Sequence, residues 1–87
     1  MKYKVHYEVD AIKTLARMPR NTAKRIRQKI NHLAADPYAP NNNVTTLQGM
    51  PGYRLRVGDW RVIYEIDDAL LKILVLKIGS RGNIYNQ

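Results

Sequence analysis

A two-stranded hairpin centred on Gly58-Asp59 is the feature that most restricts the fold of this chain. Residues 53–66 alternate in character on either side of it, and glycine at the first central position suits a type II′ turn. A two-residue turn fixes the strand register, so that Arg56 faces Arg61. The hairpin therefore predicts one apolar face and one arginine-bearing face.

The arginine-bearing face, called here the arginine patch, holds Arg54, Arg56 and Arg61. The opposite face can pack on helices and holds Tyr53, Leu55, Val57, Trp60, Val62 and Tyr64. Like charges opposite each other on a sheet are destabilising by roughly 0.2–1 kcal/mol, so the patch gains nothing unless an anion binds. Arginine stays charged and suits bidentate phosphate contacts. The patch therefore predicts phosphate or nucleic-acid binding, with solvated strand arginines as the alternative.

The segment before the hairpin predicts a strand, two helices and a loop. Residues 2–8 alternate and predict the strand. Asp10 suits the N-cap of a short helix that ends before Pro19. Residues 19–22 supply a break and a new cap for a second helix, whose apolar stripe begins at Ala23 and which ends near Asp36-Pro37. A surface loop is predicted over residues 38–44.

After the hairpin, residues 70–78 predict a mostly buried last strand, and the glycine-containing residues 79–83 predict a loose, irregular segment. The order is strand, two helices, three strands. We therefore expect an α+β fold in which two N-terminal helices pack on one face of an antiparallel-rich sheet. With 87 residues, the chain is expected to form one domain over 1–87.

Composition excludes several classes of site. The chain has no cysteine, which removes disulfides, thiolate nucleophiles and cysteine-ligated metals. His6 and His32 stand in unrelated segments, and no metal or cofactor motif is present. The N-terminus lacks the apolar stretch of a signal peptide, and no run is long enough to span a membrane. We expect a cytoplasmic protein with no membrane contact and no cofactor.

The charge is strongly positive and unevenly placed. Fifteen Lys and Arg stand against seven Asp and Glu, for a formal charge of +8. Residues 11–35 contain no acid, and their basic residues are Lys13, Arg17, Arg20, Lys24, Arg25, Arg27 and Lys29. Such an excess favours a polyanionic partner, with a solvated helix surface as the alternative interpretation.

Two stretches resemble the RelE toxins of the RelE/ParE superfamily. One runs from Leu47 to Tyr64 and contains the Tyr-Arg-Leu-Arg to Arg-Val-Ile-Tyr hairpin. The other, Lys77 to Tyr85, is similar to the family's closing segment, in which a glycine, an arginine and a tyrosine follow the last strand. The resemblance covers essentially the whole chain and implies the small RelE-like, microbial RNase-type fold.

The resemblance implies an mRNA endonuclease of a type II toxin–antitoxin pair. Such an enzyme cuts messages in the ribosomal A site through the RNA's own 2′-hydroxyl, without a metal. It implies that Arg56 and Arg61 hold the scissile phosphate, that Arg54 and Lys77 contact the backbone, that Arg81 assists the leaving group and that Tyr85 is the general base or orients the nucleophile. Ribosomal RNA contacts are expected from Lys13, Arg17, Arg20, Lys24 and Arg27.

Several RelE toxins carry lysine where this chain has Arg54 and Arg56. Arginine effectively cannot give up its proton, so both residues should act electrostatically. Many relatives also have a histidine or a second basic residue near the closing arginine, where this chain has Ser80 and Gly82. Proton transfer would therefore fall on Tyr85, and catalysis without the ribosome should be feeble.

The resemblance also implies an acidic RelB-like antitoxin as partner, with operator DNA contacted only through the antitoxin complex. Two other functions stay open. A ParE-like inhibitor of DNA gyrase shares the fold but is not a nuclease. A basic nucleic-acid-binding module without catalysis would lose affinity gradually, and in a salt-dependent way, as single arginines are replaced.

Overall fold

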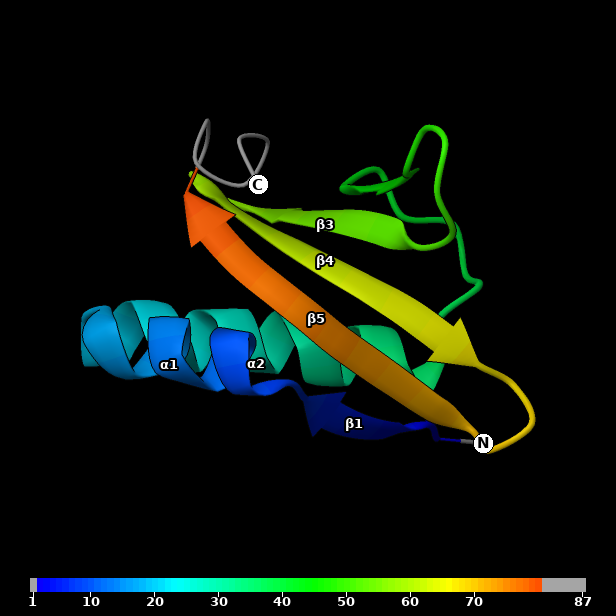
Figure 1. Cartoon of the computed structure of the whole chain (residues 1–87), viewed down its shortest axis with the longest axis horizontal. Helices are drawn as coiled ribbons and strands as arrows, with labels where there is room; N and C mark the ends of the chain where they lie inside the picture. The colour runs from blue at the N-terminus through cyan, green and yellow to red at the C-terminus, as the bar shows by residue number, and fades with distance from the viewer. Residues whose placement is uncertain (1, 81–87) are drawn as a thin grey trace.

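Two helices cover one face of a five-stranded mixed sheet (Figure 1). The computed structural model describes residues 2–80. Its elements are β1 (Lys4–Tyr7), α1 (Val9–Arg17), α2 (Arg20–Ala35), β2 (Val44–Thr46), β3 (Tyr53–Val57), β4 (Trp60–Asp67) and β5 (Lys72–Ser80). The strand order is β1-β5-β4-β3-β2, in which β1 runs parallel to β5 and the other pairs are antiparallel. The predicted α+β class is confirmed.

Proline sets the boundary between the two helices. Helix α1 ends at Arg17 because Met18 precedes Pro19 and takes an extended backbone, with φ −90° and ψ 163°. The prediction that Asp10 caps α1 is wrong. Glu8 is the N-cap residue, and its carbonyl accepts the first helical hydrogen bond from the Ile12 N–H at 3.0 Å. Asp10 lies in the first turn instead, where its charge still favours the helix dipole.

Helix α2 begins three residues earlier than its apolar stripe indicated, directly after Pro19, and ends at Ala35 as predicted. The Asp36 N–H donates to the Leu33 carbonyl at 3.1 Å, which closes the last turn before Pro37. Neither described helix combines the length and apolar character needed to cross a membrane.

The sequence did not predict the short strand β2, which follows the expected loop. Its three residues show no apolar alternation, and its pairing with β3 comes from the backbone, with Thr45 opposite Arg54. Next to it, the Arg56 N–H donates to the Asn43 carbonyl at 2.8 Å. The last strand, β5, runs to Ser80, so the first two residues of the segment expected to be loose are still paired with β4.

The hairpin has the predicted register. Arg56 pairs with Arg61 and Arg54 with Ile63, and Gly58 has the positive φ of 59° that the first central residue of the turn requires. The apolar face of the hairpin enters the core. The core consists of Ala11, Leu15, Met18, Ile26, Ile30, Leu33, Ala34, Leu55, Val57, Val62, Tyr64, Ile73, Val75 and Ile78.

Tyr64 is the largest fully buried side chain. Its ring stacks on Tyr53, with centroids 5.4 Å apart and planes at 20°. Its hydroxyl has no hydrogen-bond partner within residues 2–80, and burial raises its pKa. A buried hydroxyl without a partner destabilises the folded state.

Asp68 joins three segments that lie far apart in the sequence. Its two carboxylate oxygens accept hydrogen bonds from the hydroxyls of Tyr38 and Tyr3, each at 2.7 Å. These bonds lower the pKa of Asp68 and raise the pKa of Tyr38 to about 12. Asp68 therefore ties the β4–β5 turn to the start of the chain and to the loop after α2.

Replacing Tyr64 with Phe is expected to raise the free energy of unfolding by about 1 kcal/mol, because it removes a buried, unsatisfied hydroxyl and keeps the ring. The free energy of unfolding is measured by urea denaturation, followed by the fluorescence of Trp60, the single tryptophan. Tyr53→Phe is the control and should leave the midpoint nearly unchanged. A clear loss of stability in Tyr64→Phe would show that the hydroxyl has a partner.

Asp68 is expected to make stability depend on acid pH. Its pKa in the folded state lies below the ordinary 3.8, so its contribution is present above that value and is lost as the pH falls through the lowered pKa. Urea midpoints measured over a descending pH series should fall more steeply for the wild type than for Asp68→Asn. The double variant Tyr3→Phe/Tyr38→Phe should behave like Asp68→Asn, and equal slopes in all three proteins would contradict the assignment.

Candidate functional site

The three arginines of the arginine patch lie together on the sheet face opposite the core. Arg56 and Arg61 are direct cross-strand partners on β3 and β4, and Arg54 stands two residues before Arg56 on β3. All three line a small cleft of about 180 Å³, here the patch cleft, which is completed by Asn42, Asn43 and Thr45. The predicted clustering is confirmed.

Neutral oxygen atoms orient two of these guanidinium groups. The Arg61 Nη1 donates to the carbonyls of Gly58 and Trp60, both at 3.1 Å, and the side chain is half-buried. The Arg56 Nη2 donates to the Asn43 Oδ1 at 3.2 Å. Within residues 2–80, neither arginine forms an ion pair with a carboxylate. Both groups are therefore held in place while their positive charge stays uncompensated by a described acid.

A second cleft, the helix-side cleft, lies beside the first and brings in helix α2. Arg25 and Lys29 line it together with Asn43, Arg56 and Arg61, and its volume is about 490 Å³. Sequence analysis counted Arg25 and Lys29 as basic helix residues but did not place them with the arginine patch. Their i, i+4 spacing already put them on one helix face. Which face meets the hairpin became known only from the packing of α2.

Asn43 is a third residue that sequence analysis missed. Its carbonyl accepts the Arg56 N–H, and its side chain accepts the Arg56 guanidinium. The Asn43 N–H in turn donates to the Asn41 Oδ1 at 2.9 Å, which is a local turn typical of asparagine. The Asn-rich loop therefore positions Arg56, and the run of three asparagines was the available signal.

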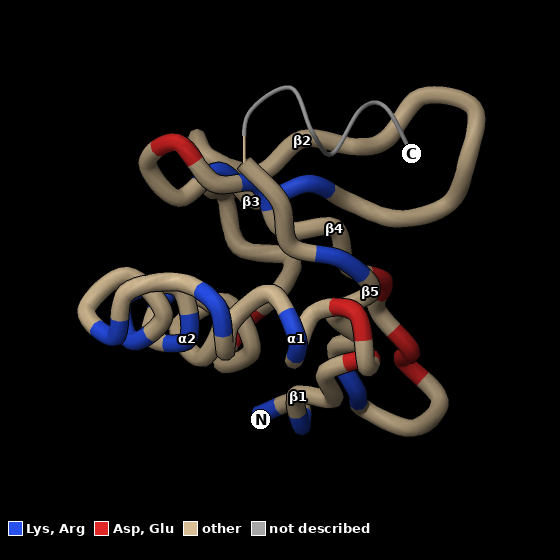
Figure 2. The backbone as a smooth tube through the Cα atoms, turned by 60° about the vertical axis from the view of Figure 1, so that its left-hand side comes forward, with Lys and Arg blue, Asp and Glu red and all other residues tan. Residues whose placement is uncertain are grey.

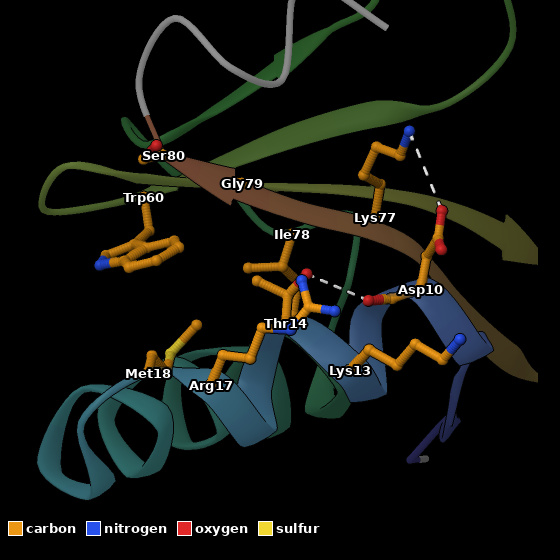
Figure 3. A pocket seen from close by; sticks show the side chains of 10 residues that line it. All are labelled: Asp10, Lys13, Thr14, Arg17, Met18, Trp60, Lys77, Ile78, Gly79 and Ser80. Atoms are coloured by element: carbon orange, nitrogen blue, oxygen red, sulfur yellow. Dashed lines mark hydrogen bonds and ion pairs between the residues drawn. The ribbon is translucent and has the colours of Figure 1, made fainter.

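Lys77 lies outside the patch cleft. It lines a cleft of about 450 Å³ between α1 and β5, which also contains Lys13 and Arg17 (Figure 3). There, the Lys77 Nζ lies 4.0 Å from a carboxylate oxygen of Asp10. The Lys77 side chain leaves β5 on the opposite side from Ile78 (Figure 3), and its cross-strand partner Ile63 stands two residues after Arg61. Lys77 therefore lies on the sheet face of the arginine patch without lining the patch cleft or the helix-side cleft.

Three basic residues of α2 lie outside the three clefts described above. Arg27 lies over the ring of Tyr7, 5.7 Å from its centroid, on the side of β1. Arg20 and Lys24 are exposed on α2 and line none of the three clefts described above. Arg81 and Tyr85 lie outside the described residues.

Charge is separated along the sheet (Figure 2). Lys and Arg occur along both helices and on the hairpin strands, whereas Glu65, Asp67 and Asp68 gather where β4 ends, away from the hairpin turn. At the turn itself, the helix-side cleft is lined by four cationic side chains and one carboxylate.

This arrangement can bind and orient a phosphate group, because fixed arginines supply paired N–H donors and positive charge. Proton transfer must come from other groups, since arginine does not titrate at usable pH. His6 is paired with Glu8 at 2.9 Å on β1, at the sheet edge opposite β2. Within residues 2–80, no three His, Asp or Glu side chains come together as a metal site.

The comparisons with known proteins agree on one family of toxins. The model of the family described as ParE toxin of type II toxin-antitoxin system, parDE, matches residues 5–85. A RelE-like toxin protein of Escherichia coli is 24% identical over 88 residues, which cover 99% of this chain and 93% of that protein.

Solved structures agree with the family match. The archaeal RelE–RelB complex from Pyrococcus horikoshii OT3 contains a chain that is 30% identical, with a TM-score of 0.79 over 95% of this chain and 99% of its own. The RelBE2 complex from Mycobacterium tuberculosis matches in fold, with a TM-score of 0.80 at 20% identity over 93% of this chain and 100% of its own. Because the family model spans nearly all of the sequence, this chain belongs to the RelE/ParE family of toxins from type II toxin–antitoxin systems.

Proposed function

We propose that this toxin is an endoribonuclease that cleaves mRNA in the ribosomal A site without a metal. The observation that carries the proposal is the cross-strand pair Arg56 and Arg61, held in place with no described carboxylate to neutralise it. An isolated protein gains nothing from two facing guanidinium groups. A phosphodiester bound between them reverses the sign of that interaction.

The reaction is an attack by a 2′-hydroxyl oxygen on the adjacent phosphorus. The P–O5′ bond breaks as the new bond forms, leaving a 2′,3′-cyclic phosphate on one product and a 5′-hydroxyl on the other. Arg56 and Arg61 stabilise the charge that develops on the non-bridging oxygens. Because Arg61 is already fixed by two carbonyls, little reorganisation is needed as that charge develops.

The proton balance is assigned to Tyr85 and Arg81, whose roles follow from the family resemblance. Tyr85, as the phenolate, takes the proton of the 2′-hydroxyl, or orients that hydroxyl while a ribosomal group takes the proton. Arg81 stabilises the negative charge on the departing 5′-oxygen, which then takes a proton from solvent water to become the 5′-hydroxyl. An unperturbed tyrosine has a pKa near 10, so nearby cations must lower it for this role at neutral pH. We propose that the ribosome supplies the remaining positioning, with Arg54 holding the neighbouring backbone.

We further propose that an acidic RelB-like antitoxin neutralises the toxin. The support is the net charge of +8, together with relatives whose solved structures are RelE–RelB and RelBE complexes. Operator DNA would then be contacted only through that complex.

Inhibition of DNA gyrase is the second candidate, because the matching family model is described by the ParE toxin. This function needs no RNA cleavage, so the arginine patch would serve as a binding surface. A supercoiling assay with purified gyrase separates the two candidates.

Arg61→Ala is expected to lower the rate of ribosome-dependent cleavage by about 10²–10³-fold, the usual effect of removing one preorganised donor from a developing oxyanion. Primer extension maps the message 5′ ends in a purified translation system. Lys4→Ala is the control, because it removes one positive charge from exposed β1, at the far edge of the sheet. Intact message with the wild-type protein, or equal cleavage by Arg61→Ala, would contradict the proposal.

Tyr85→Phe is expected to bind RNA with wild-type affinity and to lose cleavage, because it removes the ionisable hydroxyl and keeps the ring. Binding is measured with a labelled RNA, and cleavage by the same primer extension. If the variant cleaves at the wild-type rate, the base is not Tyr85, and a ribosomal group becomes the candidate.

A further inference from the structure

We propose that Arg25 and Lys29 of α2 form a second phosphate position for the same RNA strand, next to the arginine patch. The strand then passes from the sheet face towards α2 at the hairpin turn. The choice of RNA as the ligand rests on the proposed function. The two clefts and their charged side chains are observed whatever reaction the protein catalyses.

The patch cleft and the helix-side cleft share one wall. Asn43, Arg56 and Arg61 line both of them. Arg54 lines only the patch cleft, and Arg25 and Lys29 line only the helix-side cleft, with Lys29 one turn after Arg25. A phosphate at Arg56 and Arg61 is therefore flanked by cations on both sides.

The turn itself leaves room for Arg25. An ideal Cβ placed on Gly58 would lie 3.9 Å from the Arg25 Nη1, so the guanidinium is at van der Waals distance from the space above the turn. Glycine is required there for its φ of 59°, and the close distance places the Arg25 guanidinium directly beside the hairpin turn.

The charges of the helix-side cleft favour an anion. Four cationic side chains line it against a single carboxylate, Asp59. Helix α2 itself contains no acid, so Arg25 and Lys29 have no i, i+4 partner to neutralise them. Because Arg25 and Lys29 lie beside the arginine patch, they add to the repulsion between its like charges. A bound polyanion would offset this repulsion.

The lining favours a nucleic-acid backbone over an antitoxin segment. Val57 is the one apolar residue among those that line the helix-side cleft, and the patch cleft is lined by Asn, Thr and Arg alone. An amphipathic peptide helix needs an apolar groove for its anchors. A phosphodiester backbone needs only cations and polar donors, which these two clefts supply.

The test is the salt dependence of RNA binding without ribosomes. Wild type and Arg25→Gln/Lys29→Gln are titrated against a fluorescently labelled single-stranded RNA by anisotropy, over a series of KCl concentrations. The slope of log affinity against log salt is expected to flatten by about 0.7 in the double variant, because that is the contribution of the one phosphate contact that the variant loses on a single strand. Circular dichroism verifies that the variants are folded.

The matched control is Lys2→Gln/Lys4→Gln, which removes the same charge from exposed positions at the other edge of the sheet. Its slope should equal that of the wild type. Equal slopes for the two double variants, or no RNA binding by the wild type, would overturn the inference.

Cleavage is scored separately by primer extension. If the wild type fails to cleave on ribosomes but the slopes differ as expected, the proposed function fails and the second phosphate position stands. If the wild type cleaves and Arg25→Gln/Lys29→Gln binds RNA with an unchanged slope, the second phosphate position fails alone.

Discussion

The register of the β3–β4 hairpin is the constraint on which both the core and the candidate site depend. It places Leu55 opposite Val62 on the side that packs against the helices, and Arg56 opposite Arg61 on the other side. Because strand side chains alternate, a slip of one residue would move the arginines into the core and the aliphatic residues into solvent. The two-residue turn excludes that slip, and Gly58 with its positive φ makes the turn possible. The packing of the core and the placement of the arginine patch are therefore set by the same backbone geometry.

This shared geometry explains why the site is an open surface. A chain of 87 residues has little core to give up to an internal cavity. The sheet instead uses one face for packing and leaves the other for charge. The hydrogen bonds from Arg61 to two carbonyls and from Arg56 to Asn43 restrict side chains that would otherwise move freely in solvent. The repulsion between the guanidinium groups lowers stability, and a bound phosphate is the condition under which the arrangement becomes favourable.

Local chemistry made part of this structure predictable. The hairpin register, the helix ends at Arg17 and Ala35 and the face of each arginine all follow from glycine, proline and alternation within a few residues. Pairings between distant segments were not predictable in the same way. No side-chain pattern in the sequence predicts the backbone pairing of β2 with β3. The approach of Arg25 to Gly58 depends on how α2 packs across the sheet. The arginine patch was therefore found from the sequence, while Arg25, Lys29 and Asn43 were found only in the fold.

The composition of the two hairpin clefts also bears on why a toxin of this kind would need the ribosome. The side chains that line them can hold a phosphate in a fixed orientation, but arginine, lysine and asparagine do not exchange protons at neutral pH. Asp59 is the one carboxylate among the residues that line either cleft, and it belongs to the turn. The described fold thus supplies positive charge and orientation, and the proposed function assigns the acid–base step to Arg81 and Tyr85 or to groups of the ribosome. Under the proposed function, such a protein would bind RNA on its own and cleave efficiently only where the ribosome already holds the message in line.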